Sequence, residues 1–486
     1  MSREKKRDLR VAIVGAGPGG LSTGVLLGQA GFENYTILEK QAGVGGTWQR
    51  TRYPGLCCDI AAPLYSFSFE LNPEWSGPYP PQSELLAYFE HTAEKYGVLP
   101  HTRLGVAVEN AAWNEDEAHW TLRLDTGERI EADVVVSAVG MFGAPSLPDI
   151  DGLDSFEGTC FHAAEWDEAH DLRGERVGVI GSAASAIQFV PEIAKQARQV
   201  HLFQRTANWV LPKGDEPYTP EQRERFRSDP AAVQAARDEV WDTLDPGGAG
   251  AFTAIHAQME EVCRAHMAVV EDPEVRRKLE PGHPWGCKRP LLSNQYYPAF
   301  NRKNLELVTE GIERVTPTSV ITVDGNERRV DTLVLATGYE TTKFASVIDF
   351  EGRGGLKLSE AWRDGAQAYK GVVTAGFPNL FMLYGPNTNG DSLITTIEFE
   401  AAYAVRQVQR LIEEDLAWID VRPEAMAAYN EALQRDIAAV EPWQAGCSDY
   451  YRSPSGRIVT QWPGRMSELR DRLETPDRGD YETAPR

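Results

Sequence analysis

Three glycines near the beginning of the chain have the spacing of a cradle for a dinucleotide. Gly15, Gly17 and Gly20 follow the apolar run 9–14 and lead into a helical pattern, so a strand, a turn and a helix are expected. The first glycine makes the turn, the second lets phosphate approach the backbone, and the third lets the helix pack on the strand. Glu39 ends the next apolar run, where a carboxylate accepts from ribose hydroxyls and repels a 2′-phosphate. This unit is therefore predicted to bind FAD or NAD rather than NADP.

A second unit of the same form occurs further along the chain, but its turn departs from the glycine pattern. Gly181 stands at the first position, whereas Ala183 and Ala186 replace the second and third glycines. The methyl group of Ala183 lies where phosphate would approach the backbone, so a turn that no longer binds a nucleotide is one alternative. Arg205 and Thr206 end the following strand, however, and offer a guanidinium and a hydroxyl to a 2′-phosphate. The pattern favours NADPH over NADH.

Two such units, one ending in an acid and the other in an arginine, indicate a protein that binds FAD and NADPH and passes hydride from nicotinamide to flavin. The six cysteines include no C-x-x-C pair, so neither a zinc site nor a redox-active dithiol is expected. The adjacent Cys57 and Cys58 are expected to be reduced, and the nine dispersed histidines give no metal-ligand spacing. Electrons are therefore predicted to pass to oxygen rather than to a disulfide.

The composition is that of an ordinary globular protein with several domains. The 486 residues are 42% hydrophobic and 25% charged, which excludes a disordered or fibrous chain. Acidic residues (72) outnumber basic residues (49) by 23, so nucleic acid is not an expected partner. Most of the first ten residues are charged, and no apolar run approaches the ~20 residues that span a bilayer. We expect no membrane insertion and a cytoplasmic location.

The motifs must be positioned by an α/β fold with two Rossmann-like dinucleotide-binding domains. Alternating segments at 120–136 and 319–335 predict antiparallel hairpins that return into a sheet. Residues 219–279 are rich in Glu, Arg, Ala and Met without a strand pattern, which predicts a helical insertion in the NADP domain. The predicted boundaries are 1–145 and 146–218 for the first parts of the FAD and NADP domains, 219–280 for the insertion, 281–340 for the second part of the NADP domain, and 341–486 for the second part of the FAD domain with the C-terminal segment.

A longer motif lies just before the second unit. Phe156, Gly158, His162, Trp166 and Asp167 stand in the order F-x-G-x-x-x-H-x-x-x-W-D, which resembles the fingerprint of Baeyer–Villiger monooxygenases among the class B flavoprotein monooxygenases. We expect these fingerprint residues to couple domain motion to NADP binding rather than to react with substrate. The resemblance continues in the expected order over most of the chain, through residues 45–48, 52–55, 59, 65–66, 204–209, 288–289, 336–339 and 376–380.

The resemblance implies roles for residues at matching positions. Arg289 matches an active-site arginine that holds the nicotinamide and stabilises a flavin peroxide anion. Asp59 either orients Arg289 or is a structural turn residue. Contacts to FAD are implied for Glu39, Thr47, Trp48, Asp59, Tyr65 and Val108. Contacts to NADP are implied for Gly181, Ser182, Ala183, Ala184, Ser185, Arg205 and Thr206, with Lys288 near the 2′-phosphate.

The resemblance also implies a reaction. NADPH reduces FAD, O2 forms a flavin C4a-peroxide, and one oxygen atom is inserted beside the carbonyl of a small-molecule ketone to give an ester or lactone. A fixed guanidinium would favour the peroxide anion, which is the form that attacks a carbonyl. Two alternatives stay open: oxygenation of nitrogen or sulfur by a related class B enzyme, and an NADPH–flavin reductase that never stabilises a peroxide.

Overall fold

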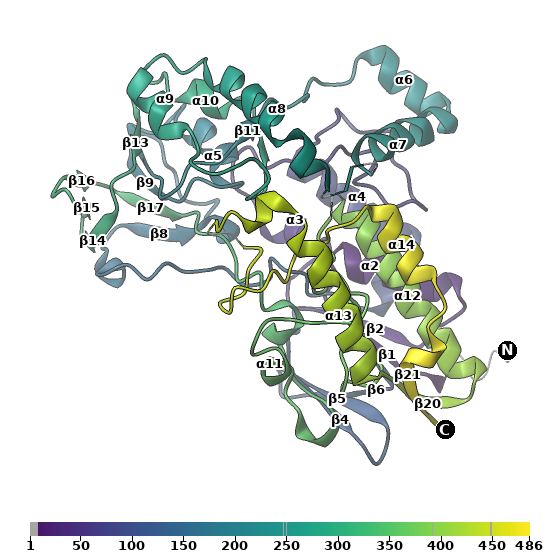
Figure 1. The fold of residues 1–486 in the computed structure, drawn as a ribbon. Coiled ribbons are helices and arrows are strands. Elements are labelled where there is room, and N and C mark those ends of the chain that lie inside the picture. The colour runs from purple at the N-terminus through teal and green to yellow at the C-terminus, as the bar shows by residue number, and fades with distance from the viewer. Residues whose placement is uncertain (1–7, 246, 249, 391, 448–449) are drawn as a thin grey trace.

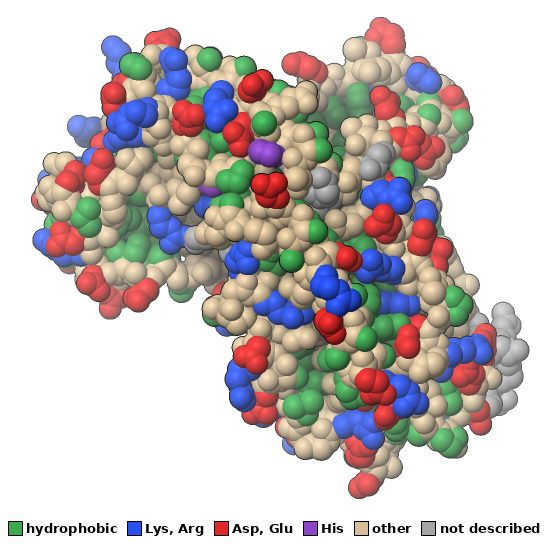
Figure 2. Space-filling view, viewed as in Figure 1, with side chains coloured by type: hydrophobic (Ala, Val, Ile, Leu, Met, Phe, Trp, Pro, Cys, Tyr) green, Lys and Arg blue, Asp and Glu red, His purple; other side chains and the backbone are tan. Residues whose placement is uncertain are grey.

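Two parallel five-stranded sheets organise the fold, and each lies in its own lobe (Figure 1). The computed structural model describes residues 8–245, 247–248, 250–390, 392–447 and 450–486. The two sheets confirm the prediction of two Rossmann-like units. On the face shown in Figure 2, acidic and basic side chains are interspersed over both lobes. Within the described residues, no helix is long and apolar enough to cross a membrane.

The first sheet has the strand order β19-β7-β1-β2-β3, with all neighbours parallel. Its central strands are buried and apolar, as expected for a parallel sheet covered on both faces. Helix α2 (Pro18–Gln29) connects β1 to β2 and begins earlier than its helical pattern predicts, because Pro18 has the fixed φ that suits a first helical turn. The strands are β1 (Val11–Val14), β2 (Tyr35–Glu39), β3 (Thr102–Leu104), β7 (Val134–Ser137) and β19 (Leu380–Met382).

The second sheet has the order β13-β10-β9-β17-β8 and repeats the parallel arrangement of the first. Helix α5 (Ala186–Ile193) follows β9 as α2 follows β1. The strands are β8 (Thr159–His162), β9 (Arg176–Ile180), β10 (Gln199–Phe203), β13 (Leu305–Val308) and β17 (Thr332–Leu335).

Both predicted hairpins are confirmed, and each feeds a strand of the adjacent parallel sheet. The first leads into β7 and the second into β17. The first belongs to a small sheet of β4 (Val108–Asn114), β5 (His119–Leu124), β6 (Arg129–Ala132) and β18 (Asp349–Glu351). The second belongs to a sheet of β14 (Ile312–Thr316), β15 (Ser319–Thr322) and β16 (Glu327–Arg329). Two further short pairs are β11 (Val210–Leu211) with β12 (Leu291–Leu292), and β20 (Leu416–Val421) with β21 (Tyr481–Pro485).

The described residues of the segment predicted as a helical insertion form four helices, of which α6 and α7 project away from the second sheet (Figure 1). They are α6 (Pro220–Ser228), α7 (Pro230–Leu244), α8 (Gly250–Met267) and α9 (Pro273–Leu279). After β19 the chain forms the long helix α12 (Leu393–Glu413), which packs along α2 and returns the chain to the first lobe. The other helices are α3 (Thr47–Arg50), α4 (Gln82–Lys95), α10 (Tyr296–Ala299), α11 (Leu358–Ala361), α13 (Pro423–Ala438) and α14 (Met466–Glu474).

Candidate functional site

The first glycine turn leaves one face of its backbone open. Gly15 has φ +106°, and a Cβ there would lie 2.6 Å from the carbonyl oxygen of Ala138. A Cβ on Gly20 would lie 1.9 Å from the carbonyl oxygen of Gly15, so both glycines are required by the fold. A Cβ on Gly17 would come no closer than 3.4 Å to the nearest atom, on Gly46. The open face at Gly17 therefore fits an approaching pyrophosphate, as the sequence predicts.

Glu39 lies directly beside this turn at the end of β2. Its buried carboxylate accepts from the backbone N–H of Ala16 at 2.6 Å and from that of Gln41 at 2.8 Å. The backbone N–H of Val106 donates to the carbonyl of Glu39, which brings the segment before Val108 to the same edge of the sheet. The acid predicted to contact a ribose is thus held at the end of the glycine turn.

Helix α3 and the loop that follows it bring three of the predicted FAD contacts to the same place. The N–H of Gly45 donates to the carbonyl of Ala16, so the start of α3, where Thr47 is exposed, lies against the glycine turn. The indole Nε1 of Trp48 donates to the hydroxyl of Tyr65 at 3.1 Å, and the two rings meet edge to face. Thr47, Trp48 and Tyr65 are therefore near one another and near the turn.

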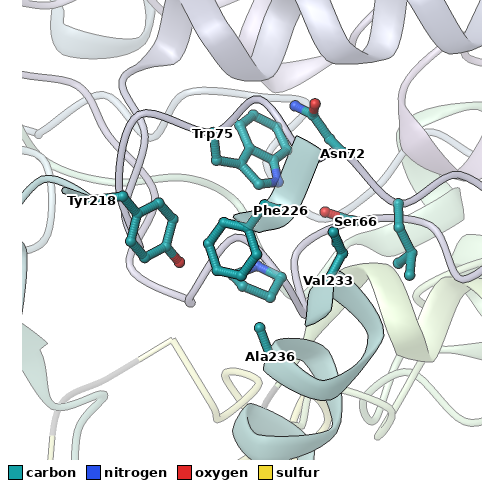
Figure 3. A pocket seen from close by; sticks show the side chains of 9 residues that line it. Ser66, Asn72, Trp75, Tyr218, Phe226, Val233 and Ala236 are labelled. Atoms are coloured by element: carbon teal, nitrogen blue, oxygen red, sulfur yellow. The ribbon is translucent and has the colours of Figure 1, made fainter. Parts of the chain in front are cut away.

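The helical insertion anchors the loop that carries Tyr65, a role the sequence did not indicate. Arg237 of α7 is buried, donates to the carbonyl oxygens of Pro63 and Ser66, and lies 3.5 Å from the carboxylate of Glu398 in α12. A small pocket beside this anchor is lined by side chains of α6, α7 and the loop (Figure 3). The insertion and the first lobe thus meet at one buried charge pair. No sequence motif marks Arg237, because its partners are far away in the chain.

The second glycine turn reproduces the geometry of the first. Gly181 has φ +107°, and a Cβ there would lie 2.3 Å from the carbonyl oxygen of Ala336, as Gly15 relates to Ala138. Ala183 and Ala184 are exposed at the turn, Ser182 is buried, and Ser185 is the residue before α5. The methyl group of Ala183 therefore projects from an accessible turn rather than filling the core. The turn keeps the shape of a phosphate cradle despite its missing glycines.

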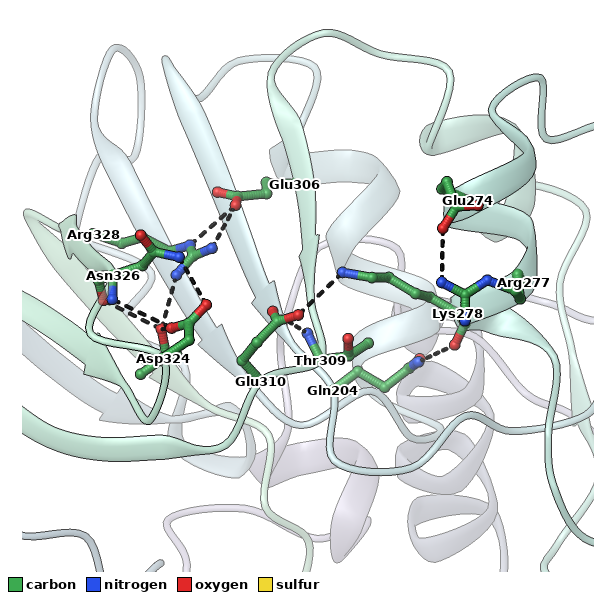
Figure 4. Close-up of polar contacts among 11 residues, drawn as sticks. Gln204, Glu274, Arg277, Lys278, Glu306, Thr309, Glu310, Asp324, Asn326 and Arg328 are labelled. Carbon is green, nitrogen blue, oxygen red and sulfur yellow. Dashed lines mark hydrogen bonds and ion pairs between the residues drawn. The ribbon is translucent and has the colours of Figure 1, made fainter.

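Basic groups gather beyond the end of β10. Arg205 is exposed, and within the described part of the chain it forms no ion pair. The side chain of Gln204 donates to the carbonyl of Lys278 in α9 at 3.0 Å, and Lys278 Nζ lies 3.3 Å from Glu310 (Figure 4). An exposed guanidinium without a carboxylate partner suits a phosphate dianion. The geometry fits the 2′-phosphate predicted for this position.

Asp59 and Arg289 form the polar centre between the lobes. Nη2 and Nε of Arg289 lie 2.8 Å and 3.2 Å from the same carboxylate oxygen of Asp59. The carboxylate raises the pKa of the Arg289 guanidinium well above its ordinary value, so this side chain stays charged. Both side chains keep about a third of their surface exposed, 32% for Arg289 and 37% for Asp59. The ion pair favours the prediction that Asp59 orients Arg289, with Lys288 next to it.

The fingerprint residues occupy the connection into the second sheet. The ring of Phe156 covers Gly158, and a Cβ on Gly158 would meet that ring at 2.6 Å. His162 ends β8, where its ring accepts from the N–H of Ala164 and burial lowers its pKa. Asp167 is exposed and accepts from a backbone N–H two residues on.

Trp166 joins the fingerprint to the contact between the lobes. Its ring packs on Phe189 of α5, with centroids 5.2 Å apart, while Tyr53 of the first lobe packs on Phe189 at 5.7 Å. The hydroxyl of Tyr53 also donates to the side chain of Gln188 at 2.9 Å. The fingerprint therefore touches the helix that follows the second glycine turn, where domain motion would be transmitted.

Two tyrosines beside Arg289 were not found from the sequence. Tyr384 and Tyr450 lie close enough to Arg289 to raise the pKa of its guanidinium through their charge interactions with it. Tyr384 follows β19, and Tyr450 lies in the C-terminal segment. Neither tyrosine belongs to a recognisable motif. The one sequence signal is that each lies in a segment that belongs to the first lobe.

Comparisons with known proteins agree over nearly the whole chain. Residues 12–238 match the family model described as pyridine nucleotide-disulphide oxidoreductase. The chain is 40% identical over 465 residues to the Baeyer–Villiger monooxygenase of Pseudomonas aeruginosa, covering 94% of this chain and 88% of that protein. Cyclohexanone monooxygenase from Rhodococcus sp. Phi1, solved with NADP+ bound, has TM-score 0.88 and 30% identity, covering 98% of this chain and 99% of that chain. OTEMO, solved in complex with FAD and NADP, has TM-score 0.86 and 27% identity, covering 98% of this chain and 100% of that chain.

Proposed function

Because the chain belongs to the family of Baeyer–Villiger monooxygenases, we propose that it uses FAD, NADPH and O2 to convert a ketone into an ester or lactone. The observation that carries the proposal is the Asp59–Arg289 pair, which lies between two dinucleotide-binding folds. A reductase needs two nucleotide sites as well, but it has no need for a fixed cation where they meet.

The first lobe would hold FAD through residues already close together. The open backbone at Gly17 would take the pyrophosphate, Glu39 the adenosine ribose, and Thr47, Trp48, Tyr65 and Val108 the rest of the cofactor. When bound and reduced, FAD supplies the two electrons that activate O2. The chain's own contribution is to hold the cofactor beside Arg289 and to exclude water from that place.

The second lobe would bind NADPH across its own turn. Backbone groups of Gly181, Ser182, Ala183, Ala184 and Ser185 would hold the pyrophosphate at the start of α5. The 2′-phosphate would lie among Arg205, Thr206 and Lys288. A dianion among these groups accounts for a preference for NADPH over NADH.

Arg289 would stabilise negative charge as the ketone is attacked. Its guanidinium is a permanent cation held in one orientation by Asp59, so its donors need little rearrangement when an oxyanion develops on the carbonyl oxygen. Such preorganised donors contribute about 10²–10³ in rate. We therefore assign Arg289 as the catalytic residue and Asp59 as the residue that orients it.

The test is product analysis with labelled oxygen. The purified holoenzyme is supplied with NADPH and ¹⁸O2 together with cyclic and open-chain ketones, and in parallel with thioethers and tertiary amines. We expect an ester or lactone that carries one ¹⁸O atom for each NADPH consumed. Labelled sulfoxide or N-oxide alone would replace the proposal with heteroatom oxygenation, and hydrogen peroxide as the only product would replace it with a reductase. A cytoplasmic location is proposed only from the sequence and would be tested by cell fractionation.

A further inference from the structure

Two consecutive carbonyl groups just before Asp59 are held by side chains from outside the first lobe. Nε2 of Gln188 in α5 donates to the carbonyl oxygen of Cys57 at 3.1 Å. Nζ of Lys213, two residues after β11, donates to the carbonyl oxygen of Cys58 at 2.9 Å. The segment that carries Asp59 is therefore fixed through its backbone as well as through its ion pair.

Lys213 is a buried lysine whose ammonium group has three contacts on the first lobe. Besides the Cys58 carbonyl, its Nζ lies 3.0 Å from Sγ of Cys57 and 4.6 Å from the centre of the Tyr79 ring. Cys57 and Cys58 are free thiols, as the sequence predicts. An ammonium has three donors, and burying it is costly unless they find partners. The contacts of Lys213 therefore serve the junction with the first lobe.

One short ribbon carries both Lys213 and Arg289. Strands β11 and β12 pair in parallel, with Lys213 two residues after β11 and Arg289 two residues before β12. The side chain of Asn294 accepts from the N–H of Lys213 at 2.9 Å and donates to its carbonyl oxygen. The ribbon thus presents two cations to the first lobe, one to the carbonyl of Cys58 and the other to the carboxylate of Asp59.

The contact of Lys213 fixes the backbone from which Asp59 projects. The carbonyl of Cys58 and the N–H of Asp59 belong to one planar peptide group, so holding the oxygen sets the direction of the bond to the Cα of Asp59. The contact of Gln188 holds the preceding peptide group in the same way. Both backbone dihedral angles of Cys58 are therefore set, and the carboxylate of Asp59 starts from a fixed position.

We propose that Lys213 is a positioning residue for Asp59, which in turn orients Arg289. Lys213 acts through the backbone and does not contact the reacting atoms. Without it the carboxylate would shift and the guanidinium would turn with it, and a misplacement of 1 Å at a catalytic group lowers a rate by up to about 100-fold. The proposal rests on the proposed function and deepens it by naming what fixes the orienting acid.

The first experiment compares Lys213→Met with Lys303→Met, which changes an exposed lysine of the second lobe. Ester and hydrogen peroxide formed per NADPH, KM for NADPH and FAD content are measured on the holoenzyme with the ketone that the wild-type protein converts fastest. We expect Lys213→Met to form ester at least about tenfold more slowly and to release more peroxide, because a hydrogen bond from a charged group is lost. KM for NADPH and FAD content should stay near the wild-type values.

Two results of this experiment would overturn the proposal. One is ester formation by Lys213→Met at the wild-type rate. The other is a loss of ester that only follows a loss of FAD, since that would show a role in folding alone. Lys213→Arg keeps a cation with donors and should form ester faster than Lys213→Met.

The second experiment asks whether Lys213 acts through Asp59. Adding Lys213→Met to Asp59→Ala should change the rate of ester formation by less than about twofold, because the group that Lys213 positions is already absent. Full additivity of the two substitutions would show that Lys213 acts independently of Asp59 and would overturn the proposal.

A crystal structure of Lys213→Met gives a readout that does not depend on activity. We expect the 2.8 Å contact between Asp59 and Arg289 to be lengthened or lost, and its retention at the present length would contradict the positioning role. If Lys213→Met does not fold, Asn294→Ala releases the backbone of Lys213 at a partly exposed position. It should also slow ester formation, and a wild-type rate in that variant would then overturn the proposal.

The two proposals fail in different ways. Peroxide release by the wild-type protein as fast as NADPH is consumed, with every ketone, would refute the oxygenase, and the crystal structure would still decide the role of Lys213. Ester formation by the wild-type protein with no change in Lys213→Met would refute only the positioning role.

Discussion

Arg289 lies 2.8 Å from Asp59, although 230 positions of sequence separate the two residues. Asp59 belongs to the first lobe and Arg289 to the segment that follows the helical insertion. The pair therefore forms only when both lobes are folded and docked. A charge held in this way is placed where two bound dinucleotides would meet.

Arg289→Ala should keep FAD bound and lose oxygenation by at least about 100-fold, since a preorganised oxyanion donor contributes 10²–10³ in rate. Arg289→Lys should recover little, because an ammonium lacks the planar fork that pairs with Asp59. The measurement is ester formed per NADPH in the holoenzyme, with Arg314→Ala on the exposed hairpin as the control. Ester formation by Arg289→Ala at the wild-type rate would remove Arg289 from the mechanism.

Arg205→Ala should weaken NADPH binding selectively. A charge-assisted contact with phosphate is worth ~1.5–3 kcal/mol, so KM for NADPH should rise about 10–100-fold with kcat and KM for NADH nearly unchanged. Arg198→Ala changes an exposed arginine of the same lobe and should leave both KM values alone. A proportional change for NADH and NADPH would show that Arg205 does not contact the 2′-phosphate.

Gly17→Ala and Gly20→Ala should separate binding from folding. The new Cβ at Gly17 has no neighbour closer than 3.4 Å, so the protein should fold but lose FAD when its pyrophosphate meets the methyl group. The new Cβ at Gly20 would lie 1.9 Å from a carbonyl oxygen, so that variant should not give folded protein. Flavin absorbance and circular dichroism report the two outcomes. Full FAD content in Gly17→Ala would contradict the placement of the pyrophosphate.

Glu400 should make stability fall as pH rises. Burial raises its pKa to about 8, whereas an unfolded chain titrates near the ordinary value of 4.5. Between these values the folded state holds a proton that the unfolded state has lost, so the free energy of unfolding falls by up to ~1.4 kcal/mol for each pH unit. Glu400→Gln should flatten this slope between pH 5 and 8, and the exposed Glu413→Gln should not. Denaturant unfolding across this range would contradict the assignment if the wild-type and Glu400→Gln slopes agree.

Local patterns were sufficient to predict the two nucleotide-binding units. Buried parallel strands appear in the sequence as apolar runs. A turn that requires positive φ is indicated by the glycine at that position, as at Gly15 and Gly181. The hairpins before β7 and β17 were predictable for the same reason, since alternation and turn residues act over short distances.

Contacts between distant segments were not predictable in this way. The disulfide between Cys287 and Cys447 follows from no spacing pattern, and the contact of Arg237 with the Tyr65 loop depends on how the insertion docks. The proximity of Tyr450 to Arg289 depends on how two distant segments fold together, so no local pattern predicts it. The Asp59–Arg289 pair was anticipated from a family resemblance rather than from the residues alone.

The most direct test of the central claim is rapid mixing of the protein, reduced by NADPH without air, with oxygenated buffer. We expect a transient flavin absorption band, distinct from the bands of reduced and oxidised FAD, that persists without ketone and decays faster as ketone is added. Direct return to oxidised FAD with release of hydrogen peroxide, unaffected by any ketone, would contradict it.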